Sequence, residues 1–400
     1  MAERKPRERI WTRPFVLLTL GNMMYTFGFY MLIQTIPLFV TAKGGTQVEV
    51  GVVASSFTIS AILLRIFSPF LLSKLTKKNL LRIALVISVL VIGSCGFAPA
   101  YGAIIAFRVV QGFGFGMVST VMGTLAADLL PDSRRGEGIG YFGMGTTLMV
   151  MLAPGVGLIL SKYMGFDRIF LIAAIGPLLS LVFLQIFSPP EELNRPVPIK
   201  TAGGSAIRSV LKNIYDPKLA LLTTMMLFFG ISRSMEQTFL TLSAKAQGID
   251  VALIAIYPFF QAAVSFVAKY FTGILFDKRG HAWAIIPGGA LYLTALVLMS
   301  FSRDIWTLLA AGFFSGAGMG ALLPGMQSWF VTSVEQNRRS VATASYYNFY
   351  DAGQTIGAPA LGGVVSALGY LPTFRIAAVP MAVFLGIYLL FRPRKSGGTA

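Results

Sequence analysis

Long apolar runs separated by short polar turns make up most of this 400-residue chain. A run of about 20 apolar residues lets an α-helix cross the hydrocarbon core of a bilayer. The pattern predicts an all-α integral membrane protein with twelve spans, near residues 15–40, 49–72, 80–97, 100–130, 138–160, 168–188, 219–243, 251–275, 282–301, 304–333, 340–367 and 373–391.

The polar residues between the runs repeat at an offset of 204 residues. The matching stretches are Arg65–Lys74 with Lys269–Lys278, Gly112–Gly116 with Gly316–Gly320, and Arg134-Arg135 with Arg338-Arg339. Apolar runs match by chance, whereas polar punctuation in register indicates two copies of one unit. We expect a six-helix bundle in residues 1–188, a cytoplasmic linker in 189–218 and a pseudo-symmetric second bundle in 219–400. Two such halves suggest a transporter with its site between them.

Composition and charge support a membrane protein. Hydrophobic residues make up 55% of the chain and charged residues only 12%, unlike a water-soluble domain. If both termini are cytoplasmic, 23 Lys and Arg fall in cytoplasmic segments and six in outside segments, as the positive-inside rule prefers. The net charge of +17 therefore follows from topology. Nucleic-acid binding is disfavoured because the basic residues sit in loops between apolar spans.

Two of the sixteen acidic residues, Glu236 and Asp351, lie well inside predicted spans. A charge at the bilayer centre costs about 2.5–3.5 kcal/mol on insertion scales, so both are candidates for proton coupling. Asp351 belongs to a polar stripe at helical spacing that must face a cavity or another helix. From this stripe we expect Tyr347, Asn348 and Gln354 to contact substrate. The alternative is that Asp351 forms a static interhelical hydrogen bond.

Glu236 follows Arg233 by three residues, so the two can pair on one helical face. A permanent structural pair is one interpretation. The other is that proton binding at Glu236 frees Arg233 to hold an anionic group or to change partner. Under that interpretation Arg233 serves both proton coupling and substrate binding.

Polar residues also recur along the first predicted helix. Asn22, Thr26, Tyr30 and Gln34 are four residues apart and would line a cavity with neutral hydrogen-bonding groups.

Several other functions are disfavoured by the motifs. Gly112-x-Gly114-x-Gly116 follows no strand and fits helix packing better than a dinucleotide loop. There is no Gly-Lys-Ser/Thr phosphate loop, and one histidine and one cysteine make a metal site or catalytic triad improbable. We expect no cofactor and no enzymatic activity.

Residues 273–280 read Gly-Ile-Leu-Phe-Asp-Lys-Arg-Gly, and residues 108–112 in the fourth span read Arg-Val-Val-Gln-Gly. The first stretch is similar to the loop signature Gly-x-Leu-x-Asp-Arg-x-Gly, and the second to a further signature, of the major facilitator superfamily. Within that superfamily the chain resembles the drug–proton antiporter-like members. In the first half Pro69, Ser73, Lys74 and Thr76 replace the Gly, Asp, Arg and Gly of the loop signature.

The resemblance covers nearly the whole chain and implies roles for further residues. Arg108 would act in proton coupling or substrate contact together with Gln111, unless it snorkels to the outer interface. Gating is implied for Asp128, Gly273, Asp277, Lys278, Arg279, Arg338 and Arg339. Pro154 in the fifth span and Pro359 in the eleventh stand beside glycines and are expected to bend their helices.

These observations predict a transporter of the cell inner membrane with both termini cytoplasmic, working by alternating access. Proton-coupled efflux of a small organic solute is the leading mechanism. A proton-driven uptake symporter of an anionic or zwitterionic solute and a lipid or lysolipid translocator are the alternatives. The expected partners are the solute, protons and the bilayer, with nothing requiring more than a monomer.

Overall fold

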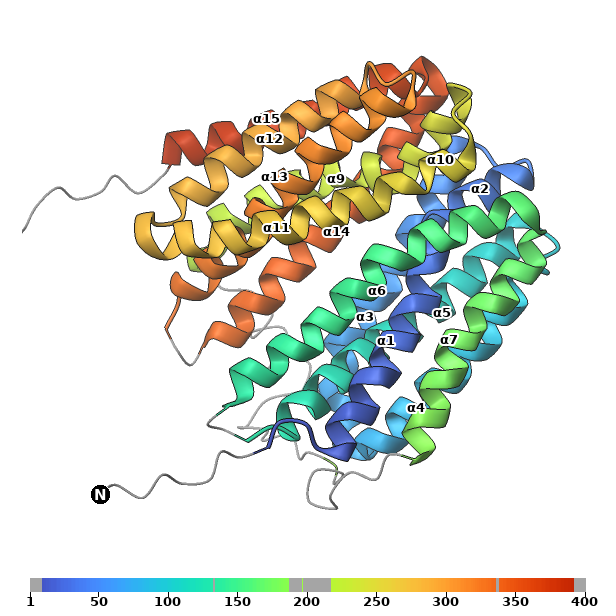
Figure 1. Ribbon diagram of the computed structural model, residues 1–400, viewed down its shortest axis with the longest axis vertical. Helices are drawn as coiled ribbons and strands as arrows, with labels where there is room; N and C mark the ends of the chain where they lie inside the picture. The colour runs from blue at the N-terminus through green and yellow to red at the C-terminus, as the bar shows by residue number, and fades with distance from the viewer. Residues whose placement is uncertain (1–8, 132–133, 187–195, 197–216, 336–337, 392–400) are drawn as a thin grey trace, which may run out of the picture. The chain divides into compact units, whose positions relative to one another are not determined.

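The computed structural model describes residues 9–131, 134–186, 196, 217–335 and 338–391, without the side chains of residues 69, 136, 273–279 and 340. All regular elements in these ranges are helices (Figure 1). Contacts divide the chain into two compact units, Met1–Gly45 with Val52–Val210, and Thr46–Gly51 with Leu211–Ala400. That residues 189–218 form a linker stays a prediction, because almost all of them lie outside the described residues.

The first unit is built from helices α1 to α7, except for the start of α3, because residues 47–51 belong to the second unit. Their bounds are α1 Arg13–Ile33, α2 Thr35–Ala42, α3 Gln47–Lys74, α4 Lys77–Cys95, α5 Tyr101–Asp128, α6 Arg135–Tyr163 and α7 Phe166–Ile186. The span predicted near 15–40 consists of two helices. Helix α1 is capped at Gln34, and α2 begins at Thr35.

The second unit begins with a short 3₁₀ turn, Pro217–Leu219, and continues with helices α9 to α15. Their bounds are α9 Ala220–Ala246, α10 Val251–Ile254, α11 Ile256–Arg279, α12 Ala282–Met299, α13 Ile305–Thr332, α14 Arg339–Leu368 and α15 Tyr370–Phe391. Every span predicted from the sequence falls on a long helix, which confirms the all-α membrane fold.

Among the described residues, ten helices are long and apolar enough to cross a membrane. The long helices outside this group are α9 and α14, with 27 and 30 residues. At a rise of about 1.5 Å per residue both exceed the hydrocarbon thickness of about 30 Å, so it is their polarity that sets them apart. These two helices carry Glu236 and Asp351.

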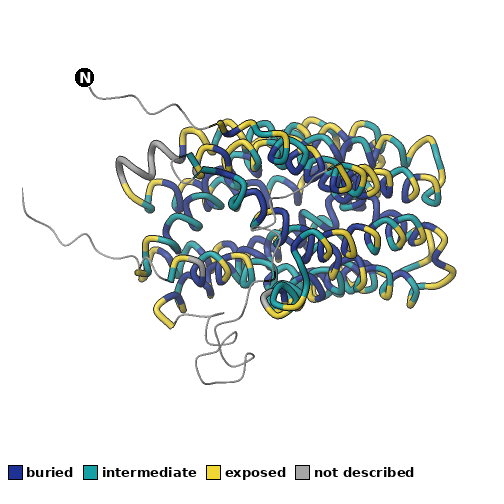
Figure 2. The backbone as a smooth tube through the Cα atoms, turned by 90° about the horizontal axis from the view of Figure 1, so that it is seen from below, coloured by how far each residue is buried: buried dark blue, intermediate teal, exposed yellow. Residues whose placement is uncertain are grey.

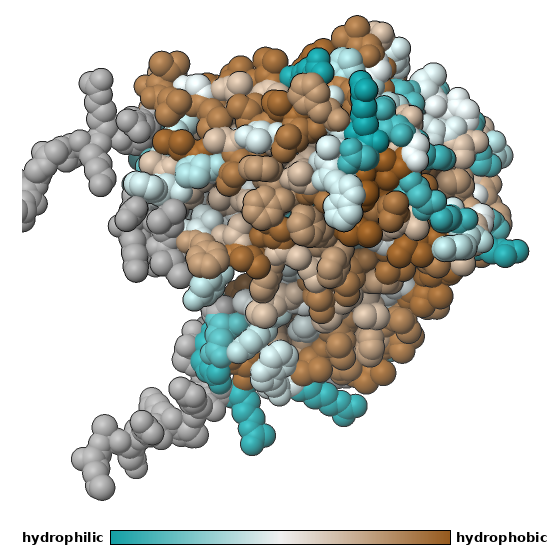
Figure 3. Space-filling model, turned by 45° about the horizontal axis from the view of Figure 1, so that its top comes forward, coloured by the Kyte–Doolittle hydropathy of each residue, from teal (hydrophilic) through white to brown (hydrophobic). Residues whose placement is uncertain are grey.

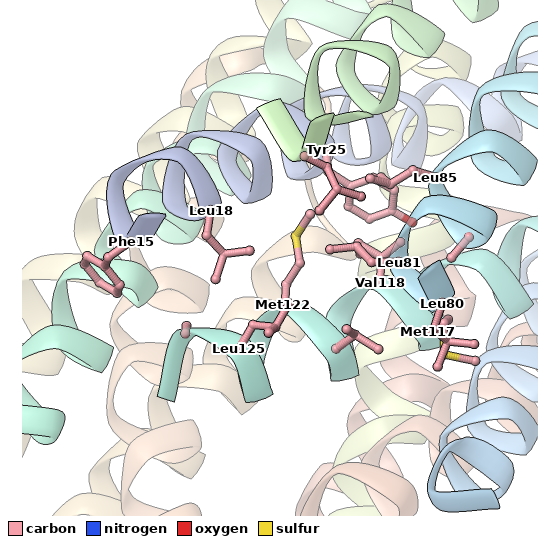
Figure 4. Close-up of a cluster of buried hydrophobic side chains, with 14 of the residues drawn as sticks. Phe15, Leu18, Tyr25, Leu80, Leu81, Leu85, Met117, Val118, Met122 and Leu125 are labelled. Atoms are coloured by element: carbon pink, nitrogen blue, oxygen red, sulfur yellow. The ribbon is translucent and has the colours of Figure 1, made fainter. Parts of the chain in front are cut away.

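Apolar side chains fill the interior of the first unit and also cover its helices outside. Figure 4 shows Tyr25 on α1 meeting leucines of α4 and the Val118 and Met122 side chains of α5, all at most 4% exposed. On the outside of the first unit, Leu90 is 62% exposed. In the second unit, Leu390 is 80% exposed. Exposed residues recur along the helices in Figure 2, and apolar side chains cover much of the face in Figure 3, which fits contact with lipid.

The 204-residue repeat recurs in the packing inside each unit. A Cβ added at Gly112 of α5 would overlap the Phe57 carbonyl of α3, and one at Gly316 of α13 would overlap the Gln261 carbonyl of α11. Phe57 and Gln261 are themselves 204 residues apart. In the same way Gly116 would meet the Ala61 carbonyl at 2.7 Å and Gly320 the Ser265 carbonyl at 2.5 Å. Equivalent glycines therefore bring equivalent helices together in both units.

Candidate functional site

A single buried carboxylate is the focus of the polar contacts in the second unit. Glu236 lies on α9 and is only 1% exposed. Its Oε2 meets Arg233 Nη1 at 2.8 Å, one turn earlier on the same helix. The same oxygen accepts a hydrogen bond of 2.8 Å from the Tyr292 hydroxyl of α12.

The other carboxylate oxygen accepts three further hydrogen bonds. Glu236 Oε1 accepts from the Tyr257 hydroxyl at 2.7 Å, from the Ser315 hydroxyl at 2.8 Å and from the Gln261 amide nitrogen. We call Arg233, Tyr257, Gln261, Tyr292 and Ser315 the Glu236 cage. The cage draws on α9, α11, α12 and α13, so packing of four helices sets its geometry.

Local sequence explains why these donors converge. Tyr257 and Gln261 stand one turn apart on α11 and therefore share a face. Gly312 and Gly316 flank Ser315 within one turn on α13, where an added Cβ at Gly312 would come within 3.0 Å of the Tyr257 ring. Without side chains at these glycines, α13 approaches α11 closely enough for the short Ser315 hydroxyl to reach Glu236.

Aromatic rings continue the cage toward α14. The Phe229 ring stacks on Tyr350 of α14 at 5.6 Å and meets Tyr292 edge-on at 5.2 Å. Tyr350 also interacts with the Arg233 guanidinium. Arg233 Nε is buried and has no hydrogen-bond partner. Arg233 thus keeps one unused donor while its Nη1 binds Glu236.

The contacts of the cage favour a charged carboxylate. Four neutral donors and one guanidinium stabilise the ionised form of Glu236, which would otherwise be very unfavourable away from water. A proton on Glu236 would cancel the ion pair and leave Arg233 as an unbalanced buried charge. Any change of charge on Glu236 would therefore act on Arg233 as well.

The Asp351 stripe lies on α14 close to this site. Asp351 is half-buried and interacts electrostatically with Tyr346 and Tyr350. Asn348 and Gln354 are also half-buried, whereas Tyr347 is 45% exposed. The roles predicted for these residues stay predictions.

Arg108 and Gln111 form the polar centre of the first unit. Arg108 is 6% exposed, and its Nη1 donates to Gln111 Oε1 at 2.8 Å. The Phe57 ring lies 4.4 Å from the guanidinium carbon, and the Val53 carbonyl accepts a long bond of 3.4 Å from Nε. The side chain turns along α5 toward Gln111 and does not snorkel to the helix start. Arg108 and Glu236 lie in separate units.

The predicted stripe on the first helix is engaged in packing in this structure. Asn22 is buried and donates to the Thr146 hydroxyl of α6 at 2.8 Å. Thr26 is also buried, and the half-buried Tyr30 meets Phe29 edge-on. Gln34 stands at the α1–α2 junction, so the stripe does not continue along one helix.

The residues implied in gating lie at the helix ends. Asp128 at the end of α5 pairs with Lys77 Nζ at the start of α4, at 2.6 Å. Arg338 is half-buried and Arg339 exposed, next to the start of α14. Gly273, Asp277, Lys278 and Arg279 are helical within α11, but their side chains are outside the description.

The two prolines expected to bend helices lie inside uninterrupted helical segments. Pro154 lies inside α6 and Pro359 inside α14. Prolines at 177, 287, 324 and 380 stand inside other helices as well, so these two positions are not distinctive.

Of the five cage residues, only Arg233 was predicted to contact Glu236. The contacts of Tyr257, Gln261, Tyr292 and Ser315 with Glu236 were not predicted. The four-residue spacing of Tyr257 and Gln261 in an apolar helix is the one local signal that could have revealed a polar face. No group of three metal-ligating side chains occurs among the residues that the structure describes.

Comparison with known proteins yields one consistent family. The family model described as Major Facilitator Superfamily matches residues 18–301 and 238–400. Multidrug resistance protein MdtG of Enterobacter lignolyticus is 27% identical, covering 98% of this chain and 94% of its own. Quinolone resistance protein NorA of Staphylococcus aureus is 21% identical, covering 89% and 90%.

Solved structures share the fold at low identity. The nucleoside transporter NupG matches with a TM-score of 0.77 at 13% identity, over 96% of this chain and 100% of its own. A POT family transporter in complex with a thioalcohol conjugated peptide matches with a TM-score of 0.80 at 14% identity, over 96% and 97%.

Proposed function

The chain belongs to the Major Facilitator Superfamily and is a multi-pass secondary transporter, and on that premise we propose that it exports a small organic solute in exchange for protons. The observation that carries the proposal is the Glu236 cage. A carboxylate that is 1% exposed and bound by partners from four helices links its protonation to the packing of the second unit.

Glu236 is the proposed proton carrier, and Arg233 responds to it. When Glu236 is ionised, Arg233 Nη1 is held at 2.8 Å. When Glu236 is protonated, the attraction weakens and Arg233 can turn to Tyr350 or to an anionic group of the solute. Asp351 on α14 is a second proposed proton site, while Arg108 contributes positive charge in the first unit.

Export is favoured over uptake by the nature of the relatives. MdtG and NorA are named for multidrug and quinolone resistance, which is the outcome of removing a compound from the cell. The inner membrane with both termini in the cytoplasm is part of the proposal, because the basic residues then gather on the cytoplasmic side. A monomer suffices, since each half has its own bundle.

Proton movement in inverted membrane vesicles tests the proposal. With an acidic lumen and a pH-sensitive dye, a panel of cationic dyes, sugars, amino acids and organic anions would be added one class at a time. Antiport predicts that one class releases lumenal protons, and that Glu236→Gln abolishes this release. Arg303→Gln, at an exposed turn before α13, is the matched control that should leave it unchanged.

Other outcomes assign other functions. Proton movement in the same direction as the solute would indicate a symporter. Solute movement without protons, unchanged in Glu236→Gln, would make the cage structural. Movement of a lysolipid alone would indicate a lipid translocator.

A further inference from the structure

The first unit holds a buried cation without a carboxylate partner. Arg108 is 6% exposed, and no carboxylate in the described ranges forms an ion pair with it. Its recorded contacts are with the Gln111 amide oxygen, the Val53 carbonyl and the Phe57 ring. All three are neutral groups. The positive charge of Arg108 is therefore held away from water among neutral groups, which is an unfavourable environment for a cation.

Gln111 adds an unused hydrogen-bond donor at the same place. The residue is 3% exposed, and its Nε2 has no hydrogen-bond partner. Exchanging the nitrogen and oxygen of the Gln111 amide does not remove the problem, because Arg108 Nη1 donates to the amide oxygen at 2.8 Å. The unpaired Gln111 Nε2 donor thus lies next to the buried guanidinium of Arg108. An anion at this place could accept hydrogen bonds from both groups.

In the second unit, the residues equivalent to those around Arg108 bind a carboxylate. The repeat places Gln111 at the position of Ser315, Phe57 at that of Gln261 and Val53 at that of Tyr257, each 204 residues apart. In the second unit, Ser315, Gln261 and Tyr257 all donate to the Glu236 carboxylate. The residues around Arg108 thus stand where the second unit encloses a carboxylate.

The two units differ in where that carboxylate comes from. Helix α9, the first long helix of the second half, supplies Glu236. Its counterpart α1, Arg13–Ile33, contains neither Asp nor Glu. The first unit therefore offers a cation and a donor at this position, and none of the carboxylates that the structure describes there pairs with them.

We propose that Arg108 and Gln111 bind a carboxylate of the transported solute, which deepens and rests on the proposed function by naming the substrate as an organic anion or zwitterion. The guanidinium and the amide Nε2 offer a charge-assisted pair of donors to the two carboxylate oxygens. The Phe29 ring lies 5.0 Å from that of Phe57 and 4.4 Å from that of Phe115, so aromatic rings gather beside the guanidinium.

Two probes that differ only in charge test this site. The full-length protein in detergent would be dialysed to equilibrium against 2-naphthoate and against 2-naphthamide, its neutral counterpart. The proposal predicts at least tenfold tighter binding of 2-naphthoate. Gln111→Glu places a carboxylate inside the protein next to Arg108, so it should weaken 2-naphthoate binding at least tenfold and raise the midpoint of thermal unfolding without ligand.

Gln185→Glu is the matched control. Arg82 Nη2 donates to Gln185 Oε1 at 3.4 Å, so the same residue types meet on the exposed surface. This variant should leave 2-naphthoate binding unchanged and shift the unfolding midpoint little, because exposed ion pairs contribute little.

Three results would overturn the inference. The first is 2-naphthoate binding no tighter than 2-naphthamide binding, which includes binding of neither. The second is a Gln111→Glu protein that unfolds at a lower temperature than the wild type. The third is that the protein unfolds at a higher temperature in chloride than in gluconate and that chloride displaces 2-naphthoate. This result would assign the site to an inorganic anion. Proton release in vesicles is a separate measurement, so the carboxylate site and proton antiport can fail independently.

Discussion

Arg233 and Glu236 meet at 2.8 Å, one turn apart on α9, with Glu236 enclosed by donors from three other helices. The pair is neutral as a whole, but each member alone would be an isolated charge in a dry interior. The stability of the second unit and its proposed proton coupling therefore depend on the same contact.

Breaking this pair from one side is predicted to destabilise the protein strongly. Glu236→Gln leaves Arg233 without its counterion, and removing one partner of a buried pair costs about 3–5 kcal/mol. The double variant Arg233→Met/Glu236→Gln should be more stable than Glu236→Gln alone, because no charge remains unpaired. Thermal unfolding of the three detergent-purified proteins measures this. A double variant less stable than the single one would contradict the prediction.

Removing one neutral donor is predicted to have a smaller effect. Tyr292→Phe keeps the ring but loses the 2.8 Å hydrogen bond to Glu236 Oε2, and a bond to a charged group contributes about 1.5–3 kcal/mol. Tyr163→Phe, on a residue that is 72% exposed, is the control. The unfolding midpoint should fall for the first variant and stay for the second. Equal midpoints would mean that the Tyr292 hydroxyl does not stabilise Glu236.

The glycines that join equivalent helices are predicted to be intolerant of even one methyl group. Alanine at Gly316 would place its Cβ against the Gln261 carbonyl and push α13 away from α11 and from the cage. Gly123→Ala has open space and should be stabilised by about 1 kcal/mol, since alanine is the better helix former. Opposite signs of the change in unfolding midpoint are expected. If both variants gain stability, close helix contact at Gly316 is not required.

Because of His281, which lies just before α12, we expect the folded protein to lose stability in mild acid. Its ring stacks on Trp329 at 4.4 Å and its Nδ1 lies 2.8 Å from the Tyr388 hydroxyl. Burial lowers the pKa of His281 below its ordinary value of 6.5, because the charged ring is less well solvated in the folded protein. The unfolded chain then binds more protons as pH falls through about 6.5, so the contribution is full above that pH and is lost below it.

The pH dependence can be assigned with one substitution. Between about pH 7.5 and 5.5, the unfolding midpoint of the wild type should fall more than that of His281→Gln, which cannot take up this proton. Parallel curves for the two proteins would show that another group is responsible.

How much the sequence could predict depends on the range of the interaction. The spans were predicted because length and hydropathy are local properties, and the Arg233–Glu236 contact because i,i+3 spacing places both on one face. The break at Gln34 was missed, although Pro37 in the first turn of α2 marks it, because proline has no backbone N–H to continue the hydrogen-bond ladder of α1. Tyr292 and Ser315 lie 56 and 79 residues from Glu236, and only the packing of three helices brings them to it. An isolated Tyr or Ser in an apolar run gives no sign of such a partner.

Glu236 is the proposed carrier of the proton that drives transport. In liposomes containing the purified protein, solute exchange without a gradient and uphill transport driven by a pH gradient can be measured side by side. The prediction is that Glu236→Gln retains exchange and loses gradient-driven accumulation. If Glu236→Gln still accumulates solute when a pH gradient is imposed, Glu236 is not the proton carrier.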